Sequence, residues 1–405
     1  MNILVVNAGS SSLKYQLYDM TDESVIAKGR VERIGMDTAI LVHEPTGKEE
    51  IREVSEILDH NFAIKRVVEM LTHPQHGVIR DISEIDAVGH RVVQGGDLYS
   101  ESVLIDQSVK NGIRSLFDLA PLHNPAHMMG IEACEANMPG VPMVAVFDTA
   151  FHFTMPEHVY MYPLPLRLYK EHKVRRYGFH GTSHMYVSQV AIQMLGKPAE
   201  ETKIITCHIG NGVSVTAVKG GKSYDTSMGM TPLEGPMMGT RSGDIDPAIV
   251  PYVMGKEELS LNEVNFMLNK HSGLQAISGG SSDMREIIKG KTEGDKACSL
   301  AYDMYEYRIR KVIGSYVAAM NGVDAIVFTA GVGENANYLR KSILDNLTWL
   351  GIELDDELNN VRSSEPREIT KPGSKIKVYV IPTNEELVIA RETLSLVSKQ
   401  TSAKS

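Results

Sequence analysis

The chain of 405 residues contains few cysteines, an excess of acidic over basic residues and no long apolar run. Its three cysteines (Cys134, Cys207 and Cys298) are scattered, which excludes a disulfide framework and the paired spacing of a zinc site. The 51 Asp and Glu outnumber the 41 Lys and Arg, so a nucleic-acid-binding surface is not expected. No run approaches the ~18 apolar residues of a membrane span, and the N-terminus lacks a signal-peptide pattern. These features predict a soluble, cytoplasmic protein that binds neither nucleic acid nor membrane.

Strand-like and helix-like segments alternate along the chain, which indicates an α/β fold. The length suits two domains. Prolines at 156, 163 and 165 mark an irregular connection, so we place the boundary near its start. We therefore expect an N-terminal α/β lobe over residues 1–150 and a C-terminal lobe over residues 151–385. A helix over about 386–405 is expected to pack back on the first lobe, although the residues from about Ser398 have the composition of a polar tail.

The first eighteen residues contain a candidate ligand-binding turn. Ile3 to Val6 is an apolar run typical of a strand buried on both faces, and Leu13 to Tyr18 alternates like a half-buried strand. The small residues 7–12 between them would expose backbone N–H groups and hydroxyls to a phosphate oxygen or a hydrated metal, with Lys14 adding a cation. A polar hairpin turn is the commoner explanation of such a segment taken alone.

Two further turns of the same kind strengthen the interpretation of residues 7–12 as a ligand-binding turn. Residues 203–218 repeat the pattern of strand, glycine turn and strand, with His208-Ile209-Gly210-Asn211-Gly212 as the turn, which indicates an internal duplication. A third turn, Gly331-Val332-Gly333-Glu334-Asn335, follows a strand-like run. Three such turns at strand ends predict a nucleotide cradle between two lobes. The third also fits a loose dinucleotide fingerprint, but a lone match so late in the chain is weak evidence.

Several helix ends are predicted from capping residues. Asn124-Pro125 is expected to be an N-cap followed by proline at the first helical position, and Asp246-Pro247 to cap another helix. Residues 295–321 have the spacing of a long amphipathic helix that closes at Asn321-Gly322. Residues 227–246 contain glycines and prolines that forbid regular structure, and such a long loop is usually functional.

Charged residues on irregular segments are candidates for anion recognition. Arg91 ends a strand, Arg241 lies in the long loop and Arg285 follows a polar turn, where bidentate contacts to phosphate or carboxylate are often built. Each arginine could instead be solvated, and His180 could be a capping or core histidine. Asp148, at the carboxyl end of a strand, has the position of a catalytic or metal-positioning carboxylate. Asn7 and Glu385 could share a magnesium ion, which needs few carboxylates.

At these residues the chain resembles the acetate kinase family, within the acetate and sugar kinase/Hsp70/actin superfamily. The resemblance spans essentially the whole chain, and its most specific segments are residues 7–14, 178–184, 208–212, 231–235, 237–244 and 383–386. It implies two lobes of a duplicated ribonuclease H-like α/β fold with an interlobe cleft, and a homodimer. The implied reaction is reversible phosphoryl transfer from ATP to acetate, giving acetyl phosphate and ADP, with Mg²⁺ as cofactor and Mn²⁺ as its substitute.

The resemblance also implies roles for individual residues. Asn7 and Glu385 correspond to the magnesium-associated pair, and Asp148, His180 and Arg241 to the catalytic group. Arg91 corresponds to the acetate ligand, with a methyl pocket formed by Val93, Leu122, Phe179 and Pro232. Nucleotide contacts are implied for Lys14, His208, Ile209, Gly210, Asn211, Gly212, Asp283, Met284, Arg285, Gly331, Val332, Gly333, Glu334 and Asn335.

Two alternatives stay open at this point. An actin- or Hsp70-like nucleotide-gated binding protein would share the fold but needs a polymer interface or an appended peptide-binding domain, and no residues are left over for one. Propionate or butyrate could replace acetate, because one methylene is worth only ~1–3 kcal/mol of discrimination.

Overall fold

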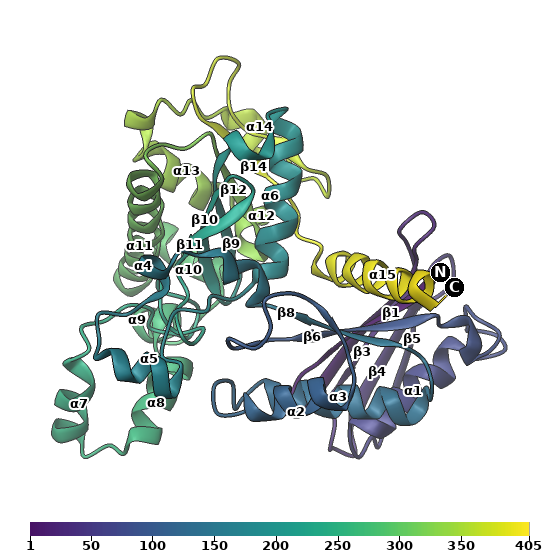
Figure 1. The fold of residues 1–405 in the computed structure, drawn as a ribbon. Helices are drawn as coiled ribbons and strands as arrows, with labels where there is room; N and C mark the ends of the chain where they lie inside the picture. Colours follow the sequence, from purple (N-terminus) through teal and green to yellow (C-terminus); the bar gives the residue numbers. More distant parts are fainter. Residues whose placement is uncertain (405) are drawn as a thin grey trace. The chain divides into compact units, whose positions relative to one another are not determined.

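A computed structural model of the chain describes residues 1–404, with side chains as far as residue 400. Residue 405, the last of the predicted C-terminal helix, lies outside the described part. The chain forms two compact units. Unit 1 comprises residues 1–150 together with the segment from residue 384 onward, and unit 2 comprises residues 151–383. Each unit is built around its own sheet (Figure 1).

Unit 1 contains an eight-stranded sheet in the order β5-β4-β3-β2-β1-β6-β8-β7. β1 runs parallel to β6, and β6 parallel to β8, whereas the other neighbouring strands are antiparallel. The strands are β1 (Asn2–Ala8), β2 (Ser12–Asp19), β3 (Ser24–Glu32), β4 (Ala39–Pro45), β5 (Ile51–Ser55), β6 (Ala87–Val92), β7 (Val103–Leu104) and β8 (Met143–Phe147).

Helices cover both faces of this sheet. α1 (His60–Leu71), α2 (Gln107–Ser115) and α3 (Asn124–Asn137) lie on one face, and α15 (Glu385–Lys404) lies on the other (Figure 1). α15 approaches closely at Gly89, where an added Cβ would lie 2.7 Å from the Ile389 side chain. The central strands β1 and β8 have apolar runs because they are buried on both faces, and Ile3 and Leu4 are fully buried.

Unit 2 contains a six-stranded sheet in the order β11-β10-β9-β12-β14-β13. Its strands are β9 (Lys203–Ile209), β10 (Val213–Lys219), β11 (Lys222–Thr226), β12 (Ala325–Thr329), β13 (Arg367–Glu368) and β14 (Lys377–Val380). Its helices are α4 (Glu157–Tyr160), α5 (Leu166–His172), α6 (Gly181–Leu195), α7 (Ile249–Glu257), α8 (Leu261–Lys270), α9 (Gly273–Ser278), α10 (Met284–Thr292), α11 (Lys296–Met320), α12 (Ala330–Asn335), α13 (Asn337–Asp345) and α14 (Asp356–Asn360).

The central strands of the two sheets have the same topology, which confirms the predicted duplicated α/β fold. In each unit an antiparallel hairpin, β1–β2 or β9–β10, places its first strand beside two successive parallel strands. These parallel strands are β6 and β8 in unit 1 and β12 and β14 in unit 2. Because carboxyl ends of parallel strands meet at one edge of a sheet, each unit gathers its strand-end residues there.

Four local predictions are wrong. The third glycine turn, residues 331–335, is helical and forms most of α12. Asp246 accepts from the N–H of Ala248 in a turn, and α7 begins only at Ile249. The expected polar tail from Ser398 continues α15 to Lys404. Asn124 is the first residue of α3 and not its N-cap, because its side chain is turned inward to the backbone of Gln94.

Other elements follow the predictions closely. α11 is capped by Asp295, whose carboxylate accepts from the N–H of Cys298, and it ends at Asn321 in the left-handed conformation. Residues 227–248 contain no helix or strand, as the glycines and prolines require. Within residues 1–404, no helix combines the length and apolar character needed to cross a membrane.

Candidate active site

Arg91 and Asp148 form an ion pair at the carboxyl edge of the unit 1 sheet. β6 and β8 are parallel neighbours, and their register places Val92 opposite Phe147, so residues at the two strand ends meet. Arg91 Nε lies 2.9 Å from Asp148 Oδ1, and Arg91 Nη2 lies 2.7 Å from Oδ2. Asp148 is only 1% exposed, whereas the Arg91 side chain is 23% exposed. This bidentate geometry fixes the plane of the guanidinium group.

Neighbouring charges act on this pair. Burial alone would lower the pKa of Arg91, but the charge of Asp148, with Glu385 and Glu386 further away, raises it above its ordinary value. His127 on α3 is buried, and its pKa falls to about 3 through burial and the charge of Arg91. His127 is therefore neutral beside the pair at physiological pH.

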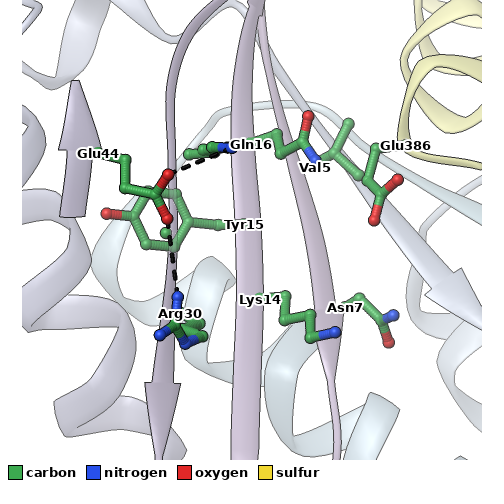
Figure 2. A pocket seen from close by; sticks show the side chains of 10 residues that line it. Val5, Asn7, Lys14, Tyr15, Gln16, Arg30, Glu44 and Glu386 are labelled. Atoms are coloured by element: carbon green, nitrogen blue, oxygen red, sulfur yellow. Dashed lines mark ion pairs between the residues drawn. The ribbon is translucent and has the colours of Figure 1, made fainter. Parts of the chain in front are cut away.

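Asn7 and Lys14 lie together on the β1–β2 hairpin. They are direct partners across the two strands, and both line a pocket of about 240 Å³ with Glu386. Figure 2 shows Lys14 and Asn7 from neighbouring strands and Glu386 reaching in from α15. Glu385, the other predicted magnesium ligand, precedes Glu386 in the first turn of α15. Sequence reasoning did not select Glu386.

The donors on this side of unit 1 fit a hard, hydrated cation. Asn7 and Glu386 line one pocket with an amide oxygen and a carboxylate, both oxygen ligands of the kind Mg²⁺ prefers, and Glu385 is the preceding residue in the first turn of α15. Among the described residues, no group of three or more His, Cys, Asp or Glu is arranged as a complete metal site. A magnesium ion here would therefore keep water or substrate oxygens in most of its coordination positions.

Unit 2 brings His180 and Arg241 to Gly212, and His208 stacks on His180. His180 is the N-cap of α6 and has the left-handed conformation, and its Nδ1 lies 2.8 Å from Ser214 Oγ. Its ring stacks on that of His208 at 4.0 Å between centroids. A Cβ added to Gly212 would lie 3.3 Å from Arg241 Nη1 and 3.4 Å from His180 Cε1. The glycine thus leaves the space in which the guanidinium and the imidazole approach each other.

Arg241 extends from the irregular 227–248 segment without an acidic partner. Its Nη1 donates to the carbonyl oxygen of Pro232 at 2.8 Å and lies 3.5 Å from Met238 Sδ. Among the described residues no carboxylate lies within ion-pair distance of it, and burial lowers its pKa. Its positive charge is therefore not compensated locally.

A pocket of about 520 Å³ in unit 2 gathers eight of the predicted nucleotide-binding residues. It is lined by Gly210, Asn211, Asp283, Met284, Arg285, Gly331, Val332, Asn335, Ala336, Asn337, Tyr338 and Arg362. Sequence reasoning missed the last four. Ala336 to Tyr338 directly continue a predicted segment and could have been included on that ground. No sequence signal marks Arg362, which comes from a separate stretch after α14.

The remaining predicted nucleotide residues have other surroundings. Ile209 is buried in β9, and Lys14 belongs to unit 1. His208 Nδ1 lies 2.8 Å from Ser183 Oγ, which lies 2.8 Å from Thr383 Oγ1. Glu334 accepts from the backbone N–H of Thr383 at 3.2 Å. Gly333 is buried within α12, and its carbonyl accepts from the buried Arg340.

The predicted methyl-pocket residues are divided between the units. Val93 and Leu122 belong to unit 1, where Val93 is buried and Leu122 is 65% exposed. Phe179 and Pro232 belong to unit 2. Phe179 is buried with its carbonyl accepting from His152, and the Pro232 carbonyl holds Arg241.

Comparison with known proteins gives a consistent result over the whole length. The model of the acetokinase family matches residues 2–391. Acetate kinase of Symbiobacterium thermophilum is 58% identical to this chain over 98% of this chain and 99% of its own length. Acetate kinase of Methanosarcina thermophila is 54% identical over 100% of this chain and 99% of its own length. Among solved structures, Porphyromonas gingivalis acetate kinase matches with a TM-score of 0.93 and 45% identity over 98% of this chain and 99% of its own. A propionate kinase from Francisella tularensis matches with a TM-score of 0.90 and 42% identity over the same shares.

Proposed function

The chain belongs to the acetokinase family, and we propose that it catalyses reversible, Mg²⁺-dependent phosphoryl transfer from ATP to acetate. The products of the forward reaction are acetyl phosphate and ADP. The observation that supports this proposal best is Arg241, a half-buried cation beside His180 with no acidic partner among the described residues. Such a charge suits an external anion whose negative charge grows during the reaction.

In this proposal Arg91 binds the carboxylate of the acid, and Val93 and Leu122 contact its methyl group from unit 1. Acetate is already ionised at neutral pH, because such acids have a pKa near the ~4 of Asp and Glu side chains. No general base is then required to make the acid a nucleophile. Asp148 orients Arg91, and its unused lone pairs are free to accept from a metal-bound water.

The phosphoryl group is stabilised by Arg241 and His180, which supply positive charge and donors to its equatorial oxygens. Asn7 and Glu385 would hold Mg²⁺, which would neutralise phosphate charge when bound. Gly212 matters here because a side chain at this position would press on both Arg241 and His180.

The nucleotide is proposed to bind in the 520 Å³ pocket of unit 2, against α12 and the start of α10. The sequence expectations of a homodimer, formed through unit 2, and of a cytoplasmic location remain part of the proposal. Exposed apolar side chains on α7 and α8 of unit 2, including Tyr252, Leu261 and Phe266, support a covered surface there.

The proposal is tested by trapping the acyl phosphate with hydroxylamine in reactions containing ATP, Mg²⁺ and acetate, propionate or butyrate. We expect a hydroxamate that depends on both ATP and acid, with acetate giving the highest kcat/KM. Higher kcat/KM with propionate would favour the activity named for the Francisella relative. No product with any of the three acids would contradict the kinase function altogether.

A further inference from the structure

The turn that follows β6 is held by side chains from two other segments of unit 1. It spans residues 93–96 and lies directly after the strand that carries Arg91. The amide nitrogen of Gly95 donates to Thr149 Oγ1 at 3.0 Å, and that of Gly96 donates to Gln94 Oε1 at 2.9 Å. The turn therefore has little freedom to move away from Thr149 and the neighbouring Asp148.

Asn124 makes the most specific of these contacts. It is fully buried, its Oδ1 accepts from the backbone N–H of Gln94 at 3.1 Å, and its Nδ2 donates to the carbonyl of Gln94 at 2.9 Å. The side-chain amide thus pairs with both backbone polar groups of one residue. Only a side chain with a donor and an acceptor in this planar arrangement satisfies both groups at once.

The backbone of the turn is closely packed against neighbouring side chains. Gly96 has a φ of +58°, and an added Cβ would lie 2.6 Å from the Leu116 side chain. A Cβ added to Gly95 would lie 3.0 Å from Thr149 Oγ1. The backbone is therefore packed tightly against Leu116 at Gly96 and against Thr149 at Gly95.

These contacts connect the segments that carry the proposed acid-binding residues. Gln94 follows Val93, Asn124 comes two residues after Leu122, and Thr149 follows Asp148. We propose that Asn124 is a positioning residue that fixes the Val93 segment relative to the Leu122 segment and thereby sets which acyl chain lengths are accepted. This inference rests on the proposed acid kinase function and adds a specificity determinant to it.

The experiment compares acids in variants of Asn124. Asn124→Leu keeps the approximate size and removes both hydrogen bonds, and Asn124→Asp keeps the acceptor and removes the donor. We expect the KM for acetate to rise and the acetate-to-butyrate ratio of kcat/KM to fall roughly fivefold, which is less than the about 10–200-fold that each of the two methylenes separating these acids can contribute. The KM for ATP should stay within about twofold, because the predicted nucleotide pocket belongs to unit 2.

Asn137 provides a matched control at the other end of α3. Its Nδ2 donates to Asn61 Oδ1 at 2.7 Å and to the Ala133 carbonyl at 2.8 Å, so Asn137→Ala removes comparable bonds far from Val93. That variant should leave the acid ratio unchanged even if its melting temperature falls. Thr149→Val removes only the bond to Gly95 and should shift the ratio in the same direction, which keeps the test available if the Asn124 variants fold poorly.

The possible failures are distinguishable. Folded variants of Asn124 and Thr149 with a lower melting temperature and an unchanged acid ratio would show a purely structural role and overturn the inference. An equal shift in Asn137→Ala would overturn it as well, because the effect would then be general destabilisation. An unmodified protein that forms no acyl phosphate would overturn the proposed function and this inference together.

Discussion

The two arginines proposed to meet the substrates lie in opposite electrostatic environments. Arg91 in unit 1 is held by both oxygens of Asp148, and the charge of that carboxylate raises its pKa. Arg241 in unit 2 makes its polar contacts among the described residues with a carbonyl oxygen and a thioether sulfur, and burial lowers its pKa. Both side chains are half-buried, so exposure does not explain the difference.

The difference suggests how each arginine acts. Arg91 is oriented before any ligand binds, but Asp148 largely neutralises its charge. Arg91 therefore favours acid binding more through the fixed orientation of its N–H donors than through net electrostatic attraction. Arg241 keeps an uncompensated charge in a poorly solvated position, which is costly in the free protein and is relieved when an anion binds. We therefore expect Arg91 to affect acid binding and Arg241 to affect the chemical step.

Replacing Arg241 should have the largest effect. Arg241→Ala is expected to lower kcat about 10³-fold or more, the range seen for arginines that stabilise transferring phosphoryl groups. Arg241→Lys should recover little, because an ammonium group cannot reproduce the planar fork. Steady-state kinetics in the acyl-phosphate-forming direction would measure both variants.

Arg91→Ala is the comparison variant. It should mainly raise the KM for acetate, because it removes a contact made in the ground state and in the transition state alike. The same split between kcat and KM for both arginines would contradict the distinction drawn here. Near-normal kinetics for both variants would remove them from the site.

Asp148→Asn should have the next largest effect, and it makes Arg91 more like Arg241. The amide keeps the shape but removes the negative charge, and it offers one acceptor oxygen where two now serve Arg91. We expect kcat to fall about 100-fold, the KM for acetate to change modestly and the Mg²⁺ dependence to shift. Kinetics at varied Mg²⁺ would measure this outcome.

A proton-transfer role for Asp148 makes a different prediction. If Asp148 were a general base, a small added base would restore the rate of Asp148→Asn, and the Mg²⁺ dependence would stay unchanged. The expected pH profile of the unmodified enzyme shows only the ionisations of substrate, nucleotide and histidine.

Much of the fold could be predicted from the sequence because its central strands are buried on both faces and therefore form apolar runs. β8 ends at Phe147, directly before Asp148 as predicted, and α11 starts and ends at the predicted caps. The errors occur where a distant contact decides the local structure. Asn124 has the sequence context of an N-cap, but its side chain pairs with Gln94, thirty residues away.

The candidate site was predictable to the extent that its residues lie in local motifs. The glycine turns supplied five of the eight predicted residues that line the pocket in unit 2, and the strand ends supplied Arg91 and Asp148. The sequence alone did not predict that Arg91 is paired and Arg241 is not. It also did not predict Arg362, which lines the pocket from a separate segment, because such contacts depend on tertiary packing.

The last prediction extends the electrostatic comparison from the two arginines to the two units. Unit 1 contains three buried histidines whose pKa is lowered mainly by burial: His43, and His90 and His127 to about 3. In unit 2 burial lowers the pKa of His184, and it raises the pKa of Asp225 to about 6 and the pKa of Asp244 and Glu306 above their ordinary values.

Acidification from pH 7 to pH 5 should therefore destabilise unit 1 more than unit 2. A histidine with a lowered folded pKa takes up its proton in the unfolded state first, so the folded state loses stability as the pH falls below about 6.5. For His90 and His127, whose folded pKa is about 3, the loss is about 1.4 kcal/mol per pH unit, or about 2 kcal/mol each at pH 5. A carboxyl group with a raised folded pKa binds its proton in the folded state first. The folded state therefore gains stability over the same interval, which offsets the loss from His184.

Peptide-resolved hydrogen exchange at both pH values, corrected for intrinsic rates, would give opening free energies for β1 and β6 in unit 1 and for β9 and β12 in unit 2. His127→Gln should reduce the loss in unit 1 by about 2 kcal/mol and leave unit 2 unchanged. Equal losses in the two units, or a larger loss in unit 2, would contradict this assignment of charges.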